Sequence, residues 1–492
     1  MNRIKTGALF ILAALLCTAA VSCGTDSTSP SDTSAADTAS SSADTETAAD
    51  TEPAYVYPEL DCGGEDFNIL NTNTTWGFYT NVYFEESTGE TLDDTVFNAN
   101  LAVEEAFNVH LNITEYDIGE AVGAYSKVIL SGDDVYQTAL TTAAQMSSLL
   151  LENYVMDLSQ FPELRLNREW WDSDVSVYSS LGGSDKVYFG VSDINLMSFE
   201  VIMGIYVNDD ILTSLDIPLL YDTVREGKWT FEKMHDCMKL AANLNGDGSF
   251  TFDQNGNAVY GLTYWESTTP ALLFGAGARY IGIDGDGIPY LAAESEQFYN
   301  VASKISELFK AEGEAIFLNK TTNGEHYEDA FEAGRTLFTC AQLKASSKFR
   351  DMEDTYGILP LPKYDEAQDT YYGYCTANVV ASTIPVTNTN PSRAAAIIDA
   401  MAYHAHTDVL PVYYGVNVEQ KQMRNEDSIE MLEIMGANRV IDVGRLYNWS
   451  KDLDTAVYQK LSKGDASIAS VIAAKKDAVQ KMIDETLEIF EE

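Results

Sequence analysis

The sequence predicts an α/β protein whose folded part forms two lobes, preceded by an export signal and an acidic segment that does not fold. Three observations lead to this prediction. A strand, a helix and a second strand follow one another between residues 67 and 113, which is the repeating unit of a parallel sheet covered by helices. Residues 55–492 are too many for one hydrophobic core. Residues 24–54 have too few apolar side chains to fold.

The elements of the first unit can be read from the spacing of apolar residues. A short buried strand is expected at residues 67–70. A helix is expected to begin near Thr91, whose hydroxyl can cap it together with Asp94 three residues on. Apolar side chains then recur at helical spacing up to Phe107, and alternation over residues 109–113 indicates the second strand. At the other end of the chain, residues 467–490 carry one apolar stripe and predict a long amphipathic helix packed on a lobe.

The N-terminus has the pattern of an export signal. Arg3 and Lys5 precede an apolar run over residues 8–16, and small residues lead to Cys23. This pattern resembles a bacterial lipoprotein signal, in which the cysteine sulfur takes a diacylglycerol, although Ala20 stands where leucine is most usual. A plain secretory signal or an N-terminal membrane anchor remains the alternative.

The segment that follows Cys23 reads as a tether. Residues 24–54 contain only Gly, Ser, Thr, Ala, Asp, Glu and Pro, so we expect a flexible acidic linker between a lipid anchor and the folded part. The formal net charge of −46 excludes nucleic acid as a partner. No second run of 18 or more apolar residues follows the signal, so no further membrane span is predicted.

Metal, cofactor and catalytic motifs are weak or missing in this sequence. Cys62, Cys237, Cys340 and Cys375 show no metal-ligand spacing, and disulfides and buried free thiols both remain open. Residues 243–251 place oxygen side chains as an EF-hand does, but start with Asn, and Gln254 replaces the bidentate Glu. A polar turn is therefore favoured over a calcium site, and no metal or cofactor is predicted. The glycines of residues 282–287 suit a hairpin turn.

Five passages resemble the extracellular solute-binding proteins of bacterial ABC importers, in particular the large carbohydrate-type group. They are EESTGETLDD (85–94) leading into VEEAFNV (103–109), SGDDVY (131–136) with MDL (156–158) and EWWD (169–172), GKWTFE (227–232) with NGDG (245–248) and YGL (260–262), FEAGRTLF (331–338), and YGILPLPK (356–363). Their order and spacing across most of the chain carry the resemblance. One departure is Thr339, Cys340 and Ala341, where the family has small apolar residues.

The resemblance implies a periplasmic-binding-protein-like fold, in which a ligand cleft lies between two α/β lobes joined by hinge strands. By similarity, the chain crosses between the lobes near residues 198–206, 372–380 and 404–413. The N-terminal lobe would hold residues 55–198 and 377–408. The C-terminal lobe would hold residues 206–372 and 412–492.

Aromatic residues suggest a sugar ligand. The chain has 28 Tyr, 20 Phe and 6 Trp, and a sugar needs flat rings for its C–H face and short polar groups for its hydroxyls. The candidates lie where strands pass into loops or at the implied crossings. They are Trp76, Tyr264, Trp265, Tyr372, Tyr374, Tyr413, Tyr414 and Trp449. Trp170 and Trp171 are expected in lobe packing instead.

The expected function is capture of a carbohydrate outside the cell, most simply an oligosaccharide, and its delivery to an ABC importer. The resemblance implies a non-enzymatic monomer, lipid-anchored to the outer face of the cytoplasmic membrane, that serves permease subunits encoded as separate chains. Two alternatives stay open: an exported enzyme acting on polysaccharide, and a surface glycan-binding protein without a transporter. With 76 acidic residues, a glycosidase carboxylate pair cannot be named from the sequence.

Overall fold

A computed structural model describes residues 55–172, 180–311, 313–319, 326–415 and 426–491 of the chain. Tyr55–Glu492 form one compact unit, and the hydrophobic core of the described residues lies entirely within it. We therefore expect this unit to fold on its own. Cys23 and the predicted tether lie outside the described residues. Among the described residues, no helix combines the length and the apolar character that crossing a membrane requires.

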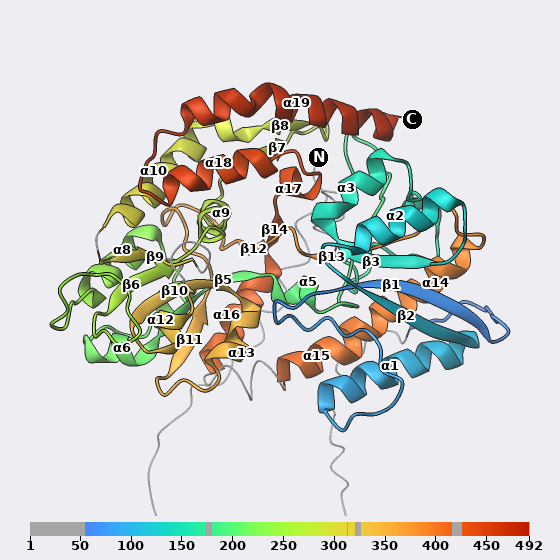
Figure 1. The fold of residues 1–492 in the computed structure, drawn as a ribbon, viewed down its shortest axis with the longest axis horizontal. Helices are drawn as coiled ribbons and strands as arrows, with labels where there is room; N and C mark the ends of the chain where they lie inside the picture. The colour runs from blue at the N-terminus through green and yellow to red at the C-terminus, as the bar shows by residue number, and fades with distance from the viewer. Residues whose placement is uncertain (1–54, 173–179, 312, 320–325, 416–425, 492) are drawn as a thin grey trace, which may run out of the picture. The chain divides into compact units, whose positions relative to one another are not determined.

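The first sheet has five strands in the order β2 (Val109–Asp117), β1 (Glu65–Asn73), β3 (Thr138–Thr142), β13 (Val380–Thr383) and β4 (Gly190–Val191). β1 is parallel to β2 and β3, whereas β13 is antiparallel to both of its neighbours. Helices α1 (Thr91–Phe107), α2 (Ala121–Ser131) and α3 (Ala143–Leu151) pack on these strands, and α14 (Pro391–His404) packs on α1 (Figure 1). We call this sheet and its helices the first lobe.

The second sheet also has five strands, in the order β11 (Tyr356–Leu359), β5 (Met203–Asn208), β10 (Thr336–Gln342), β6 (Tyr260–Tyr264) and β9 (Ala315–Phe317). β5, β6 and β10 are continuous runs of buried residues, as expected for strands that are covered on both faces, whereas the three residues of the edge strand β9 are only partly buried. With its packed helices it forms the second lobe, which lies beside the first in Figure 1.

The remaining elements cover the two sheets or connect them. The helices are α5 (Met197–Glu200), α6 (Asp209–Ser214), α7 (Tyr221–Arg225), α8 (Phe231–Ala241), α9 (Thr268–Gly275), α10 (Glu296–Lys310), α12 (Asp329–Glu332), α13 (Ser346–Phe349), α15 (Leu410–Val412), α16 (Glu426–Ala437), α17 (Val443–Leu446), α18 (Lys451–Leu461) and α19 (Ala469–Glu491). Short turns of helix are η1 (Leu158–Gln160), η2 (Ala292–Glu294), η3 (Leu343–Ala345) and η4 (Ala405–Val409). Two small sheets pair β12 (Gly373–Cys375) with β14 (Arg439–Ile441) and β7 (Ile281–Ile283) with β8 (Pro289–Leu291).

The chain passes between the lobes more than once. It leaves the first sheet after β4, turns through α5 and enters the second sheet as β5. It returns between β12 and β13, over residues 376–379. α19 packs on α18 and β8 and also reaches α3 of the first lobe, as Figure 1 shows along one edge of the unit. The lobes are thus connected by several segments that are far apart in the sequence.

Several predicted elements are confirmed. The strand expected at residues 67–70 lies within β1, the helix begins at Thr91, and β2 pairs with β1 in parallel. The predicted C-terminal helix is α19, and a hairpin forms where the glycines of residues 282–287 predicted one, with residues 282–283 ending β7 and residues 284–288 connecting it to β8. The predicted cap was wrong. Glu90 holds the cap position, and the Asp94 carboxylate accepts hydrogen bonds from the backbone N–H groups of Thr88 and Gly89 instead.

The cysteines of the folded unit are free thiols and form no disulfide with one another. Cys62, Cys237, Cys340 and Cys375 are free and buried. Burial raises the pKa of the Cys340 and Cys375 thiols to about 12. Of the two possibilities that the sequence left open, the structure therefore has buried free thiols.

Candidate ligand-binding cavity

A cavity of about 590 Å³ opens between the two lobes. Its walls come from the loop after β1, from the return segment between β12 and β13, and from the second lobe and the C-terminal helices. The lining residues are Trp76, Phe78, Trp265, Ser267, Pro270, His326, Tyr327, Gln342, Lys344, Tyr374, Thr376, Ala377, Asn378, Arg445 and Asp454. The lining thus combines residues of the first lobe, of the second lobe and of a segment that connects them.

Aromatic side chains form much of the wall on both sides. Trp76 is half-exposed and stands on the first-lobe side, next to Phe78. On the second-lobe side, Trp265 stacks parallel to Tyr327 with ring centroids 5.1 Å apart. Tyr374 packs against Phe274 with its centroid at 4.7 Å. A flat ligand can therefore meet aromatic rings from both lobes.

Polar groups lie between these rings. The Gln342 side-chain amide lies 3.4 Å from the Thr376 hydroxyl, as donor to acceptor, and Asn378 lines the same wall. The indole N–H of Trp265 is buried and has no hydrogen-bond partner among the described residues. The side chains of Gln342, Thr376 and Asn378 can hydrogen-bond to a ligand, and the number of such groups is small, as in other ligand sites.

The charged groups of the cavity are partly paired. The Arg445 guanidinium lies 3.4 Å from the Asp454 carboxylate, which also accepts a hydrogen bond from the Tyr280 hydroxyl at 3.0 Å. Burial raises the pKa of the Asp454 carboxyl. Lys344 donates a hydrogen bond to the backbone carbonyl of Trp76, so it connects the second lobe to the first across the cavity.

Beside the cavity, Glu200 occupies the first crossing between the lobes. Its carboxylate is buried and accepts hydrogen bonds from the Tyr79 backbone N–H at 2.7 Å and from the Tyr413 hydroxyl at 2.7 Å. Burial raises the pKa of Glu200 to about 7, and these donors together with the Lys344 ammonium limit the rise. The hinge region thus holds a carboxyl group that titrates near neutral pH.

The structure brings three of the eight predicted aromatic residues to the cavity: Trp76, Trp265 and Tyr374. The other five lie outside its lining, and we do not propose them as ligand contacts. Tyr264 stacks on Phe309, and Trp449 stacks on Tyr447. The Tyr372 ring contacts the Arg279 guanidinium, the Tyr413 hydroxyl donates a hydrogen bond to Glu200, and the Tyr414 ring contacts the Phe199 ring edge to face. Aromatic rings at strand ends serve the core as readily as a ligand, because both environments favour large flat apolar groups.

Several lining residues were missed by the sequence interpretation. Thr376 and Asn378 fall inside the segment predicted as the second crossing, so their position could have been anticipated. Lys344 follows β10 directly, two residues after Gln342, at the carboxyl end of a central strand where ligand sites are common. No signal marked Arg445 or Asp454, because their approach depends on the packing of α17 and α18.

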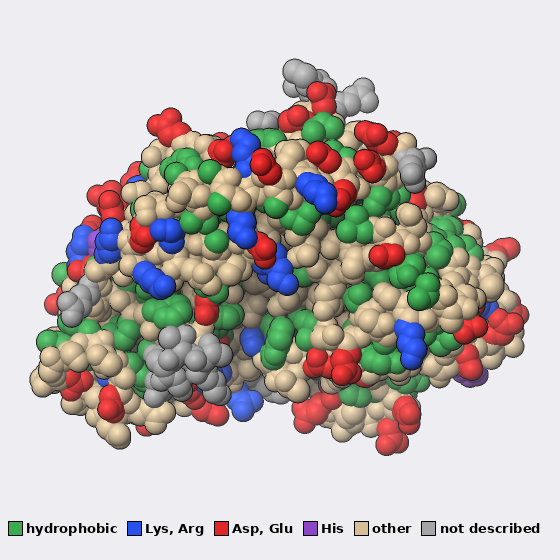
Figure 2. All heavy atoms as spheres, turned by 45° about the horizontal axis from the view of Figure 1, so that its top comes forward, with side chains coloured by type: hydrophobic (Ala, Val, Ile, Leu, Met, Phe, Trp, Pro, Cys, Tyr) green, Lys and Arg blue, Asp and Glu red, His purple; other side chains and the backbone are tan. Residues whose placement is uncertain are grey.

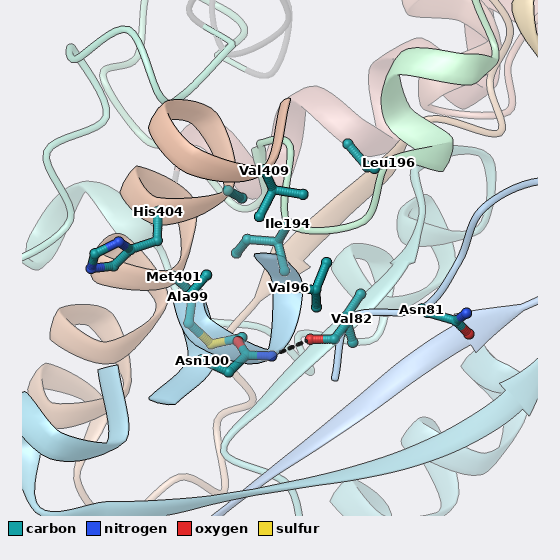
Figure 3. Close-up of a pocket in the computed structure, with 11 residues that line it drawn as sticks. Asn81, Val82, Val96, Ala99, Asn100, Ile194, Leu196, Met401, His404 and Val409 are labelled. Atoms are coloured by element: carbon teal, nitrogen blue, oxygen red, sulfur yellow. Dashed lines mark hydrogen bonds between the residues drawn. The ribbon is translucent and has the colours of Figure 1, made fainter. Parts of the chain in front are cut away.

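A second pocket is much smaller and has a different character. About 20 Å³ of space lies between α1 and the α14–η4 segment, and Figure 3 shows Val96, Ile194 and Val409 facing it. The Asn100 side-chain amide, also drawn there, donates to the backbone carbonyl of Val82 at 2.7 Å. This volume accommodates about one water molecule. It is a packing gap within the first lobe.

The polar loop at residues 243–251 uses its oxygen atoms within the protein. Both backbone N–H groups of Asn257 and Ala258 donate to the Asp247 carboxylate, at 2.6 and 2.7 Å. These hydrogen bonds hold the pKa of Asp247 below its usual range. Among the described residues, no group of three or more His, Cys, Asp or Glu side chains is arranged to hold a metal ion.

The surface around the lobes' junction is uneven in charge. Figure 2 shows a hollow near the middle of the face that it draws, with Lys and Arg side chains close to it, whereas Asp and Glu side chains are spread widely over the rest of that face. This distribution contrasts with the formal net charge of −46 for the whole chain.

Comparison with known proteins identifies the fold. No family model matches the chain, and no curated protein matches it in sequence. Solved structures match at 10–15% identity. The galacto-N-biose-/lacto-N-biose I-binding protein of the ABC transporter from Bifidobacterium longum has a TM-score of 0.57, with 87% of this chain and 98% of that chain covered. This chain has the fold of ABC-transporter substrate-binding proteins.

Two further substrate-binding proteins support the same fold. The cyclic alpha-maltosyl-1,6-maltose binding protein from Arthrobacter globiformis is 10% identical, with a TM-score of 0.56 over 86% of this chain and 99% of that chain. An ABC substrate-binding protein from Listeria monocytogenes, in complex with cycloalternan, is 12% identical, with a TM-score of 0.55 over 86% and 99%. The predicted α/β, two-lobe, periplasmic-binding-protein-like fold is confirmed.

Proposed function

We propose that this protein is an extracellular substrate-binding lipoprotein that captures a carbohydrate, most simply an oligosaccharide, in the cavity between its lobes and delivers it to an ABC importer. The observation that carries the proposal is the cavity of about 590 Å³ whose aromatic walls come from both lobes. Its volume lies within the roughly 300–1,000 Å³ typical of small-molecule sites. Two of the binding proteins with the same fold are named for the sugars that they bind, and the third was solved in complex with cycloalternan.

The wall chemistry supports a sugar. Trp76, Trp265 and Tyr374 offer ring faces for the C–H surface of a pyranose. The side chains of Gln342 and Asn378 offer donors and acceptors for hydroxyl groups. We propose these five residues as ligand contacts.

Capture follows from the position of the contacts. A ligand that touches Trp76 on one side and Trp265 on the other has more contacts when the lobes close than when they open. It therefore stabilises the closed form by the difference in its affinity for the two forms. A permease that recognises the closed form would then receive loaded protein in preference to empty protein.

The N-terminal pattern supports anchoring at the outer face of the cytoplasmic membrane. A diacylglycerol on Cys23 and the acidic linker that follows would keep the folded unit near the membrane while leaving it free to rotate. The permease subunits would be separate chains, and the binding protein a monomer. Labelling of cells with a radioactive fatty acid tests the anchor, because the wild-type protein should take up label and the Cys23→Ala variant should not.

Ligand binding is tested by thermal unfolding of the purified Tyr55–Glu492 unit with mono- and oligosaccharides, peptides and amino acids. A ligand at one hundred times its Kd should stabilise the unit by about 2.7 kcal/mol. The proposal requires that a sugar raise the melting temperature and be recovered intact. Cleavage of the sugar would favour the exported enzyme, and stabilisation by peptides alone would contradict the carbohydrate ligand.

A further inference from the structure

Lys344 differs from the other charged groups of the cavity because it forms no ion pair with a described residue. It belongs to η3, which directly follows the central strand β10, and its side chain lines the cavity beside Trp76 and Phe78. The Lys344 ammonium lies 4.5 Å from the centre of the Phe78 ring. One of its three N–H groups is used by the carbonyl of Trp76. Two donors of a charged group remain for a ligand.

The other basic side chains of the cavity lining lie beside carboxylates. The Arg445 guanidinium pairs with Asp454 at 3.4 Å, and the His326 ring lies 3.2 Å from the Glu328 carboxylate. Lys344 has no carboxylate oxygen within 4.0 Å among the residues that the structure describes. Glu328 and Glu200 act on it from farther away. Both are engaged elsewhere, Glu328 by the Tyr327 hydroxyl and Glu200 by Tyr79 and Tyr413.

Keeping a charged ammonium group in this partly buried cavity costs free energy unless an anion binds beside it. Removing a cation from water without a paired anion is unfavourable, and burial accordingly lowers the pKa of Lys344. The chain has 76 acidic residues against 30 basic ones, yet none of the described acids forms an ion pair with this lysine. An aromatic cavity that holds a cation without an ion-pair partner among the described residues is suited to an anion that comes with the ligand.

Building on the proposed function, we propose that the captured carbohydrate is acidic and that Lys344 binds a carboxylate on its ring, as in a uronic acid. The ring itself would lie against the aromatic walls. The side-chain amides of Gln342 and Asn378, which line the same cavity, supply neutral donors for the remaining oxygens. Discrimination against a neutral sugar then comes from leaving Lys344 without its anion.

The test compares acids with their own neutral forms. Titration calorimetry on the Tyr55–Glu492 unit uses oligogalacturonate, oligomannuronate and glucuronoxylo-oligosaccharide, each beside its methyl ester, together with neutral malto-, xylo- and galacto-oligosaccharides. We expect at least one acid to bind, its methyl ester to bind at least tenfold more weakly, and the acid's affinity to fall as salt is raised.

Variants assign the effect to Lys344. Lys344→Met should weaken binding of the acid at least tenfold, and Lys344→Arg should retain the preference for acid over ester. Lys348→Met is the matched control, because Lys348 pairs with Asp329 and does not line the cavity. The control should leave affinity unchanged. Melting temperatures of all variants show whether each is folded.

The outcomes separate this inference from the proposed function. If neutral sugars bind as tightly as acids, or if Lys344→Met binds the acid as the wild type does, the acidic ligand is excluded and the carbohydrate-binding function stands. If neither acidic nor neutral sugars bind, the proposed carbohydrate-binding function is contradicted, and the acidic-ligand inference is contradicted with it.

Discussion

Single residues decide how the N-terminal end of the folded unit is held, and Asp399 is the clearest case. This carboxylate is fully buried, yet it receives the Arg165 guanidinium at 2.6 Å, both indole N–H groups of Trp170 and Trp171, and the hydroxyl of Tyr55. Every acceptor position of the carboxylate is used. A buried charge of this kind is tolerated only because its partners surround it.

Replacing Asp399 by alanine should therefore be severely destabilising. The substitution leaves two buried indole donors and a partly exposed guanidinium without their acceptor. Breaking a buried ion pair costs about 3–5 kcal/mol, and because the Arg165 side chain is 26% exposed we expect a loss at the lower end of this range. Urea unfolding followed by tryptophan fluorescence measures the change. Asp222→Ala is the control, because Asp222 is 84% exposed and its pairing with Arg225 should contribute less than about 1 kcal/mol.

Aromatic residues that line the cavity should behave differently from those in the core. Trp265→Ala should weaken sugar binding roughly 10- to 100-fold, or about 1.4–2.8 kcal/mol, with a smaller loss of stability. Trp449→Ala should cost about 3–5 kcal/mol of stability, because Trp449 is 1% exposed and stacks on Tyr447. Affinity by calorimetry and melting temperature separate the two effects. Equal loss of affinity in both variants would argue against the cavity as the site.

Glu200 makes stability depend on pH. Its pKa rises from the ordinary 4.5 to about 7 on folding, so between these values the folded state binds more protons than the unfolded state. Stability from this group therefore falls as pH rises from about 4.5 to 7. Glu200→Gln should gain on the order of 2 kcal/mol relative to the wild type between pH 5 and pH 8. Unfolding free energies at both pH values measure the difference, and parallel curves for the two proteins would refute it.

The sequence predicted that aromatic side chains line the cavity, but it did not predict which of the aromatic residues do so. Trp76, Trp265 and Tyr374 reach the cavity, whereas Trp449 packs in the core, although all are aromatic residues near strand or helix ends. Their local sequence does not distinguish them, since the choice depends on which segment crosses nearby. Lys344 escaped attention for the same reason. An isolated lysine in a sequence carries no mark of whether a carboxylate will lie beside it in the fold.

Among the elements, the small sheet formed by β12 and β14 illustrates how closely segments approach beside the cavity. Gly373 starts β12 and lies against α16, where a Cβ atom would meet the backbone oxygen of Met435 at 2.0 Å. Tyr374 follows in the same strand and lines the cavity. The absence of a side chain at residue 373 thus lets the strand that carries a ligand contact pack against a helix.

Gly373→Ala should displace β12 and destabilise the unit, because a backbone atom cannot move aside as a flexible side chain can. We expect a loss of about 1–3 kcal/mol, in the range of overpacking substitutions, together with weaker sugar binding. Gly123→Ala is the matched control. A Cβ at residue 123 in α2 meets nothing within 4 Å, so this change should stabilise by about 0.5–1 kcal/mol. Chemical unfolding of both variants makes the comparison.

Elements with strong periodicity were the predictable ones. α1 and α19 follow from apolar residues at helical spacing, and the β7–β8 hairpin follows from its glycines. Short elements such as α5 and β4 have four and two residues, too few for any periodicity to appear. These short pieces form the first crossing. Periodicity therefore predicts elements inside the lobes, whereas the position of this crossing came only from the family resemblance.

For the whole molecule, the arrangement of contacts on both sides of one cavity predicts closure. Saturating ligand should reduce the radius of gyration measured by X-ray scattering in solution. It should also slow amide hydrogen exchange on both walls, in the loop that carries Trp76 and Phe78 and in the segment from Trp265 to Pro270. Protection of one wall alone would indicate a rigid surface site without lobe movement.

The predicted lobe boundaries remain a prediction. The C-terminal helix contacts elements of both lobes, so it cannot be assigned to one lobe by its contacts. α19 packs on α18 and reaches α3, and Phe490 contacts Tyr188 with ring centroids 5.3 Å apart. Amphipathic periodicity showed that this helix would be packed, but one apolar stripe does not say on how many neighbours. Such long-range placement is a property of the assembled fold.

The buried thiols make this protein easy to equip with an optical reporter. The Tyr55–Glu492 unit contains only Cys62, Cys237, Cys340 and Cys375, all enclosed in the interior and therefore shielded from alkylating dyes. Thr75 is exposed and immediately precedes Trp76 at the cavity. A cysteine introduced there by Thr75→Cys would take up a single environment-sensitive fluorophore at a known position. Its emission would then turn the molecule into a sensor for whichever sugar fills the space between the lobes.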